Sequence, residues 1–170
     1  MKETLAEINV LREARIIGQS AIGGAMGATF YLEPVSTFDL DIFVLFEGAP
    51  MILTLSPIYK FLKARGHGAE GDAIVIHGWP VQFLPAEGAL LREAVQLARE
   101  IDFEGVPARV MTAEHLMAIA LQTGRAKDYA RLVTFVEAEV ADAPVLREIL
   151  ARHGLDDAWL RFEQRYLNKS

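Results

Sequence analysis

The segment that most constrains the fold of this chain is residues 37–46, an apolar run that contains two aspartates. Side chains alternate between the two faces of a β-strand, so Thr37, Asp39 and Asp41 share one face. The opposite face is entirely apolar, from Phe38 to Phe46. The segment therefore predicts a strand with one acidic face and one face buried in a hydrophobic core.

The two carboxylates on this strand need a positive partner. In a strand, the Cβ atoms of Asp39 and Asp41 are roughly 6 to 7 Å apart, which lets both carboxylates converge on one or two divalent cations. Aspartate is depleted in strands, and two like charges on one face repel each other. A metal ion is the natural partner, and the alternative is an edge strand whose polar face is solvated.

A pair of glycines lies shortly before the acidic strand. Residues 16–22 are typical of a short strand that ends at Gly23 and Gly24, and residues 25–32 are compatible with a helix that Pro34 ends. Backbone N–H groups at such a turn, where a helix begins, can hold phosphate. The glycine turn and the aspartates together favour a site for a phosphate and a metal ion.

The other patterns predict an α/β region followed by helices. In the first part we expect helices through about residue 15, over 57–65 and over 90–101, the second with Ser56 as its N-cap. We expect strands over 73–77, 81–84 and 107–111, and a turn at 78–80 that joins the first two. Thr112 can cap a helix that Gly124 ends, and helical patterns continue to residues near the C-terminus. We therefore expect an α/β core over 1–111 and a helical region over 112–170 packed on it.

Composition excludes several classes of protein. The chain has 170 residues, a net charge of −6 and no cysteine. The acidic balance argues against strong binding of duplex DNA, and the lack of cysteine excludes disulfides, thiol nucleophiles and cysteine metal sites. No apolar run reaches the roughly 18 to 20 residues that span a bilayer, and the N-terminal residues lack the pattern of a secretory signal, so we expect a cytoplasmic protein.

The glycine pair, the short helix and the Asp-x-Asp strand resemble the signature of the polymerase-β-type nucleotidyltransferase superfamily. Residues 124–128, Gly-Arg-Ala-Lys-Asp, resemble the late motif of its small bacterial and AbiEii-toxin-like branch. The resemblance implies an α/β (α+β) fold, with a mixed sheet, flanking helices and a C-terminal helical bundle. It also implies binding of a nucleoside triphosphate with Mg²⁺ or Mn²⁺.

The resemblance assigns roles to individual residues. Gly23 and Gly24 match the phosphate-cradling turn, and Asp39 and Asp41 match the metal-binding carboxylates. Thr37 matches the polar residue that precedes them on the same face. Transfer of a phosphoryl or nucleotidyl group needs mainly positioning and charge neutralisation from the protein, which these residue types supply.

A basic group, Arg125, Lys127 and Arg131, lies beside the late motif. The resemblance gives Arg125 and Lys127 the role of neutralising a polyphosphate. The alternative is that charged residues at a helix end are solvated or paired locally.

Two positions depart from the superfamily pattern. Gln82 stands where the resemblance implies a third carboxylate of the catalytic set, and an amide cannot act as a base. Ala120 stands where relatives often have a lysine, which removes one contact to a triphosphate. These departures leave the status as an enzyme open.

Three functions follow from these residues. The first is transfer of a nucleotide to a hydroxyl of an RNA, a protein or a small molecule. The second is a degenerate member that acts as a binding or regulatory partner, for example a toxin–antitoxin component with a cognate antitoxin or as a homodimer. The third is a structural domain in which Asp39 and Asp41 only line a solvated sheet edge.

The four histidines lack metal-ligand spacing in the sequence, so we expect structural or exposed roles for them.

Overall fold

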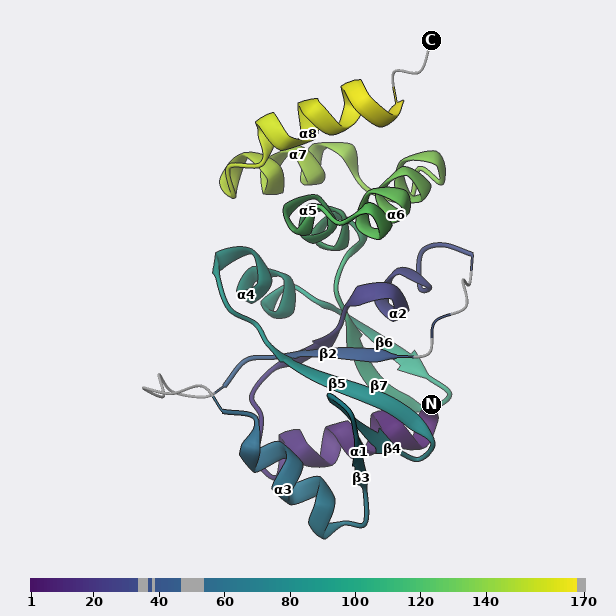
Figure 1. Cartoon of the computed structure of the whole chain (residues 1–170), viewed down its shortest axis with the longest axis vertical. Coiled ribbons are helices and arrows are strands. Elements are labelled where there is room, and N and C mark those ends of the chain that lie inside the picture. The colour runs from purple at the N-terminus through teal and green to yellow at the C-terminus, as the bar shows by residue number, and fades with distance from the viewer. Residues whose placement is uncertain (34–36, 38, 47–53, 168–170) are drawn as a thin grey trace.

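The computed structural model describes residues 1–33, 37, 39–46 and 54–167. Pro34, expected to end a helix, and Phe38, expected in the core, lie outside the described residues. The centre of the molecule is a seven-stranded mixed sheet of order β3-β4-β5-β2-β1-β7-β6 (Figure 1). Its strands are β1 (Ser20–Ile22), β2 (Leu40–Val44), β3 (Gly68–Glu70), β4 (Ala73–Ile76), β5 (Trp79–Pro85), β6 (Arg99–Phe103) and β7 (Val106–Val110).

The acidic strand β2 is an interior strand of this sheet. It pairs in parallel with β5 and antiparallel with β1. The expectation of a solvated edge strand is therefore wrong, because hydrogen-bonded neighbours flank β2 on both sides. Both sheet edges are formed by other strands. The edge strand β3 has three residues, all exposed, and the edge strand β6 has exposed Arg99, Glu100 and Asp102.

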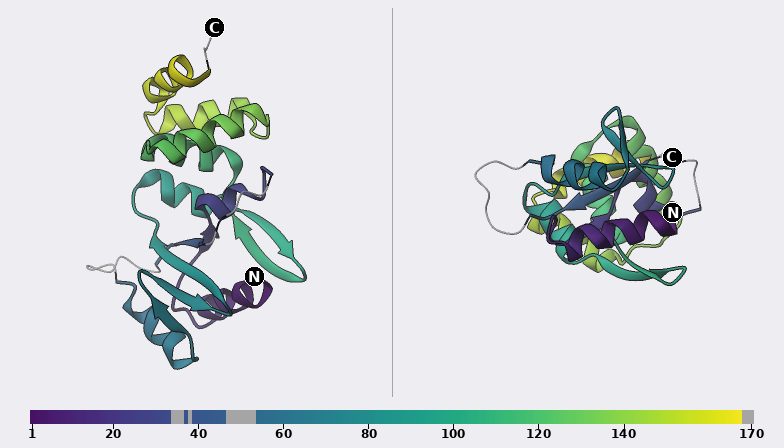
Figure 2. Two further views of the ribbon diagram at one scale, coloured as in Figure 1. Left: turned by 45° about the vertical axis from the view of Figure 1, so that its right-hand side comes forward. Right: turned by 90° about the horizontal axis from the view of Figure 1, so that it is seen from below.

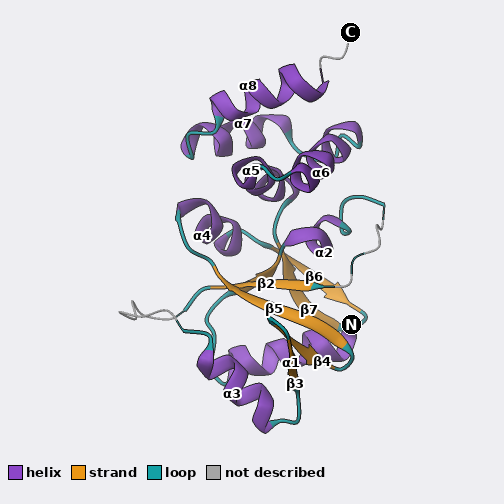
Figure 3. Ribbon diagram, viewed as in Figure 1, coloured by secondary structure: helices purple, strands orange, loops and turns teal. Residues whose placement is uncertain are grey.

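Helices cover both faces of the sheet, as Figure 3 shows by secondary structure. Helices α1 (Lys2–Glu13) and α3 (Ser56–Ala64) lie on one side, and α2 (Gly24–Ala28) and α4 (Ala89–Gln96) on the other (Figures 1 and 2). Leu40, Ile42 and Val44 of β2 are buried in the cluster that also contains residues of α1 and α3. The predicted apolar face of the strand is thus confirmed for its described residues.

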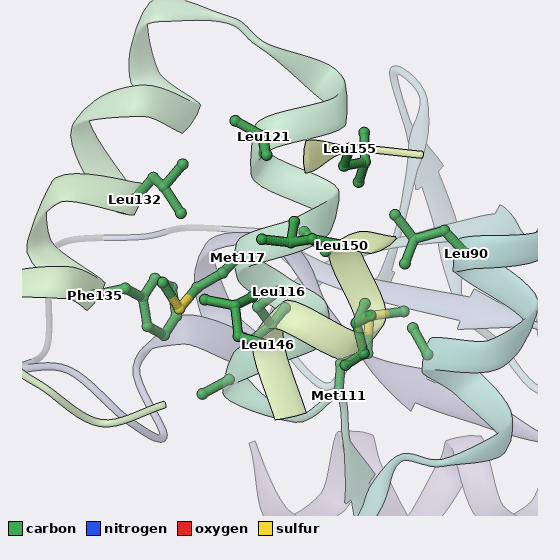
Figure 4. Close-up of a cluster of buried hydrophobic side chains, with 14 of the residues drawn as sticks. Leu90, Met111, Leu116, Met117, Leu121, Leu132, Phe135, Leu146, Leu150 and Leu155 are labelled. Carbon is green, nitrogen blue, oxygen red and sulfur yellow. The ribbon is translucent and has the colours of Figure 1, made fainter. Parts of the chain in front are cut away.

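The chain then continues as helices stacked beyond α2 and α4. These are α5 (Ala113–Thr123), α6 (Ala126–Glu137), α7 (Ala143–Arg152) and α8 (Asp156–Phe162), followed by a π-helical turn at Glu163–Leu167. Helix α5 contacts α4, α6, α7 and α8. Figure 4 shows side chains such as Leu116, Phe135 and Leu150 packed in this cluster, which also includes Met111 next to the sheet.

This arrangement confirms the expected fold class, a mixed sheet with flanking helices followed by a helical bundle. The division of the chain at residues 111 and 112 stays a prediction. None of the helices formed by the described residues has the length and apolar character that a membrane crossing requires.

Several predicted boundaries were wrong. The helix expected over 90–101 ends at Gln96, and the residues after Ala98 form β6, which pairs with β7 through a turn at Glu104 and Gly105 where φ is +53° and +84°. The turn expected at 78–80 lies at His77 and Gly78, and Trp79 begins β5.

The elements near the glycine pair are shorter than expected. The strand expected over 16–22 is reduced to Ser20–Ile22, and the helix expected over 25–32 ends at Ala28. Ser56 lies inside α3 instead of capping it.

Candidate functional site

A hollow of about 370 Å³ lies where the sheet meets α4, α5 and α6. Two carboxylates come from β2 or just before it, a third comes from α6, and cationic side chains come from α6 and its N-cap. The described residues that line it are Gly24, Asp39, Asp41, Phe43, Gln82, Leu84, Leu91, Leu116, Ile119, Ala120, Thr123, Arg125, Lys127, Asp128 and Arg131. The sheet and the C-terminal helices therefore both contribute to this hollow.

The predicted aspartate pair lies in this hollow. Asp39 is exposed and Asp41 is half-buried. Burial raises the pKa of Asp41, the negative charge of Asp39 raises it further, and the positive charges of Arg131, Lys127 and Arg125 lower it. Burial and like-charge repulsion both disfavour an ionised Asp41, so a cation bound between the carboxylates would relieve both.

The second glycine of the pair seats the Asp41 carboxylate. Gly24 has φ of +59°, and a Cβ added there would lie 1.9 Å from Oδ2 of Asp41. Because a side chain at position 24 would collide with this carboxylate and would strain a left-handed backbone, glycine is favoured there on both steric and conformational grounds. Gly24 lines the hollow, and its role in holding a phosphate stays a prediction.

The first glycine has a different structural role. The N–H of Gly23 donates to the carbonyl oxygen of Asp41 at 3.0 Å, and so extends the pairing of β1 with β2. A Cβ at Gly23 would come within 2.6 Å of the Phe43 ring. Gly23 therefore packs against β2 within the sheet and is not among the described residues that line the hollow.

Gln82 lies beside Asp41. The two residues are register partners in the parallel pairing of β2 with β5, so their side chains leave the same face of the sheet. Both line the hollow together with Lys127. The structure thus brings Gln82, Asp41 and Lys127 into one hollow, and places an amide where the resemblance implies a carboxylate.

Helix α6 and its N-cap supply the positive charge. Arg125 lines the hollow, but its Nε donates to Oδ2 of the buried Asp128 at 2.6 Å and its Nη2 donates to Oδ1 at 3.2 Å. The predicted local pairing of the late motif is therefore present for Arg125 and Asp128. Lys127 is exposed and Arg131 is half-buried, and both line the hollow. Arg131 also lies near Asp128, with its Nη1 3.8 Å from Oδ1.

Arg131 is the functional candidate to which the sequence interpretation gave no role. Among the positive charges that lower the pKa of Asp41, that of Arg131 has the largest effect. A signal was available in the sequence, because residues four apart on a helix lie on the same face and Arg131 follows Lys127 at this spacing. Arg131 and Lys127 also line a second hollow of about 250 Å³ between α6 and the residues that follow α2.

Ala120 and Thr37 differ in their position relative to the hollow. Ala120 lines the hollow, so the missing lysine leaves an apolar wall there. Thr37 is half-buried and is not among the described residues that line the hollow.

The four histidines, which are scattered in the sequence, lie in two clusters around a glutamate. His67 and His77 lie with Glu7, and His115 and His153 contact Glu93. An arginine binds each glutamate, Arg65 at Glu7 and Arg152 at Glu93. Neither cluster lines the acidic hollow.

Comparisons with known proteins find similarity to solved structures. No family model matches the chain, and no curated protein matches it. Among solved structures, it is similar to an antigenic nucleotidyltransferase-like protein from Paracoccidioides brasiliensis, at 14% identity and a TM-score of 0.63, over 98% of this chain and 89% of that one.

A second solved protein is similar over nearly its whole length. The solution structure of the antibiotic-resistance factor ANT(2″)-Ia matches at 14% identity and a TM-score of 0.52, over 98% of this chain and 100% of that one. The crystal structure of ANT(2″)-Ia in complex with adenylyl-2″-tobramycin matches at 15% identity and a TM-score of 0.50, over 95% and 98% of the two chains. The chain therefore has a nucleotidyltransferase-like fold.

Proposed function

We propose that this protein binds a nucleoside triphosphate together with Mg²⁺ or Mn²⁺ in the hollow between the sheet and α6, and transfers the nucleotide to an acceptor hydroxyl. The observation that carries the proposal is that carboxylates and cations face one hollow from opposite sides, Asp39 and Asp41 on the sheet side and Lys127 and Arg131 on α6. A polyphosphate needs both, because cations neutralise its oxygens directly and carboxylates bind it through a metal ion.

The residues present fit a hard divalent cation. Asp39, Asp41 and the amide oxygen of Gln82 offer oxygen ligands, which Mg²⁺ prefers, and water with phosphate oxygens would complete its shell. Burial and the charge of Asp39 raise the pKa of Asp41, so a cation bound beside this carboxylate would favour its ionised form. When bound there, Mg²⁺ would neutralise and orient the phosphates.

The residues of the chain then divide the work. Lys127 and Arg131 stabilise the negative charge of the phosphates, and Gly24 leaves room for the carboxylate of Asp41 at the edge of the hollow. Gln82 can orient a ligand by hydrogen bonding but cannot accept a proton. Removal of the proton from the acceptor hydroxyl therefore relies on a group other than residue 82.

Isothermal titration of ATP, CTP, GTP and UTP in the presence of Mg²⁺ tests the binding step. We expect at least one nucleotide to bind the wild-type chain and binding to be lost in the Asp39→Ala/Asp41→Ala variant. Absence of binding to all four, or unchanged binding in the double variant, would contradict the proposal.

The acceptor requires a separate assay. The bound adenylyl-2″-tobramycin in one similar structure supports small-molecule hydroxyls as the first acceptor class to try. Labelled nucleotides incubated with aminoglycosides, total RNA and cell lysate distinguish small-molecule, RNA and protein acceptors. Labelling that depends on Asp39 identifies the acceptor class.

Gln82 favours a second candidate function. A protein that keeps the nucleotide site but lacks the third carboxylate can act as a binding or regulatory partner, as the resemblance to the AbiEii-toxin-like branch suggests for a toxin–antitoxin component. This candidate predicts nucleotide binding without transfer to any acceptor. Asp39-dependent labelling in the transfer assay would exclude it.

A further inference from the structure

A cluster of ionisable side chains lies on the face of the sheet opposite the acidic hollow. Glu7 comes from α1, Arg65 and His67 follow α3, and His77 lies in the turn between β4 and β5. Figure 1 shows α1 and α3 on one side of the sheet and α4 to α6 on the other. Ligand atoms of Glu7, His67 and His77 all lie within 4.8 Å of one another.

Contacts independent of these side chains hold the three elements together, because Leu5 of α1, Leu62 of α3 and Ile76 of β4 are buried in one hydrophobic cluster. The hydroxyl of Thr4, one turn before Glu7 on α1, donates to the carbonyl oxygen of Ile76 at 3.0 Å, so α1 is fixed next to His77. The N–H of His67 donates to the carbonyl oxygen of Leu62 at 3.1 Å. The cluster therefore rests on a preformed scaffold.

His77 occupies a position where histidine is unusual. It has φ of +48° and Gly78 has φ of +83°, the two central residues of a tight hairpin turn between β4 and β5. Asparagine and glycine are the residues that such a type I′ turn prefers. The turn places the imidazole of His77 in the cluster, although its backbone conformation favours asparagine or glycine.

At the centre of the cluster is a carboxylate that is already bound to a cation. Only 8% of the Glu7 side chain is exposed. Arg65 donates to both of its oxygens, from Nε and, at 3.1 Å, from Nη2, and Nε2 of His67 lies 3.6 Å from Oε1. The hydrogen bond from Arg65 is the main reason that the pKa of Glu7 is lowered, so this carboxylate is ionised at neutral pH.

We propose that Glu7, His67 and His77 form a Zn²⁺ site in which the metal ion exchanges with the guanidinium of Arg65. Two imidazoles and one carboxylate form a donor set typical of zinc with one open position, whereas Mg²⁺ prefers oxygen ligands alone. This site is separate from the proposed nucleotide site and does not depend on it.

The geometry allows the exchange. Zinc bonds of roughly 2.0 to 2.2 Å place tetrahedral donor atoms roughly 3.3 Å apart, so the donors must move closer together as Arg65 leaves. The side chain of Arg65 is 44% exposed, and its guanidinium lies 5.7 Å from the centre of the Phe61 ring. That contact can retain the arginine at the surface after it has released Glu7.

Calorimetric titration of Zn²⁺ into the untagged full-length chain, stripped with a chelator beforehand, tests the proposal. We expect one zinc ion per chain. His67→Ala and His77→Asn should each weaken binding by at least about tenfold, and asparagine at position 77 keeps a residue that the turn favours. Circular dichroism checks that each variant is folded.

Arg65→Ala gives the sharpest result, because an ordinary structural ion pair and a competing cation predict opposite effects. If Arg65 competes with the metal, its removal should tighten zinc binding by about tenfold. His153→Ala, in the other histidine cluster, is the matched control and should leave zinc affinity unchanged.

Three outcomes would overturn the zinc site. These are no zinc binding in either the wild-type or the Arg65→Ala chain, unchanged affinity in both histidine variants, or weaker binding in Arg65→Ala.

Discussion

Gln82 of β5 is the register partner of Asp41 in β2, and both side chains line the hollow that α6 closes from the other side. The site thus has an amide directly beside its half-buried carboxylate. An amide adds no charge, so the metal-free site carries less negative charge than a three-carboxylate site would.

Gln82→Glu should therefore make the protein more dependent on a divalent cation. A third carboxylate beside Asp39 and Asp41 should lower the free energy of unfolding in a chelator by on the order of 1 kcal/mol, because like charges repel in a partly buried site. Mg²⁺ or Mn²⁺ should restore it, and the metal affinity should rise. Thermal unfolding with and without metal measures both effects, and Gln82→Asn, which adds no charge, is the control.

If the chain is an enzyme, Gln82→Glu should also raise the rate of nucleotide transfer, because it supplies the third carboxylate of the superfamily pattern. A variant that binds metal more tightly without any transfer would support the regulatory candidate instead. Equal metal affinity in wild type and Gln82→Glu would show that residue 82 does not face the cation.

Gly24→Ala should abolish nucleotide binding because a Cβ at this position collides with the Asp41 carboxylate. Gly71→Ala is a matched control, since Gly71 has φ of +60° and no atom within 4 Å of an added Cβ. Both variants should lose about 1 to 2 kcal/mol for the left-handed backbone. Titration with nucleotide and Mg²⁺ should detect the loss of binding only in Gly24→Ala, and equal affinities would contradict the steric argument.

Lys127→Ala and Arg131→Ala should each weaken nucleotide binding by about tenfold, because each removes a cation from the α6 side of the hollow. Affinity in the wild type should fall as salt is added, and less steeply in the variants. Lys60→Ala, an exposed lysine of α3 on the opposite side of the sheet, should change neither quantity. Titration calorimetry at two salt concentrations separates these outcomes.

The other histidine cluster gives a prediction about pH. Arg152 donates to Glu93 at 2.6 Å, and Nε2 atoms of His153 and His115 lie 2.9 and 3.2 Å from its carboxylate oxygens. The hydrogen bond from Arg152 is the main reason that the pKa of Glu93 falls from 4.5 to about 2. Because the pKa is lower in the folded chain, this stabilisation is present above pH 4.5 and is lost as the pH falls toward 2.

Glu93→Gln should therefore lower the free energy of unfolding by on the order of 1 kcal/mol at neutral pH, because solvent screens the half-exposed Arg152, and the difference from wild type should shrink as the pH falls. Urea unfolding at a series of pH values measures this. Glu70→Gln, at an exposed position of β3, should cost nearly nothing at any pH. A cost for Glu93→Gln that stays constant with pH would show that packing, and not charge, explains it.

The acidic strand could be predicted because its information is local. Alternation places Asp39 and Asp41 on the face opposite Leu40 and Ile42, whatever the rest of the chain does. The position of Gly24 could also be predicted from the sequence. The structural need for glycine there could not, because the contact of Gly24 with Asp41 exists only after two separate segments have paired.

Other features depend on tertiary contacts. The apolar spacing of Ala94, Ala98 and Ile101 continues a helical pattern, and pairing with β7 overrides it beyond Gln96. His67 and His77 have no metal-ligand spacing in sequence, because α3, β4 and α1 bring them to Glu7 from distant parts of the chain. Sequence spacing alone therefore predicts which residues share a face of a helix or strand, but not which helices and strands pack against each other.

The two outermost strands of the sheet also bear on how the protein behaves at high concentration. An exposed strand edge can recruit another chain, and natural proteins oppose this with short strands and charged residues. Here β3 is three residues long, and β6 presents Arg99, Glu100 and Asp102 to solvent. A second copy adding to either edge would find few backbone groups or would have to cover charges, so the native sheet resists growth into fibrillar aggregates.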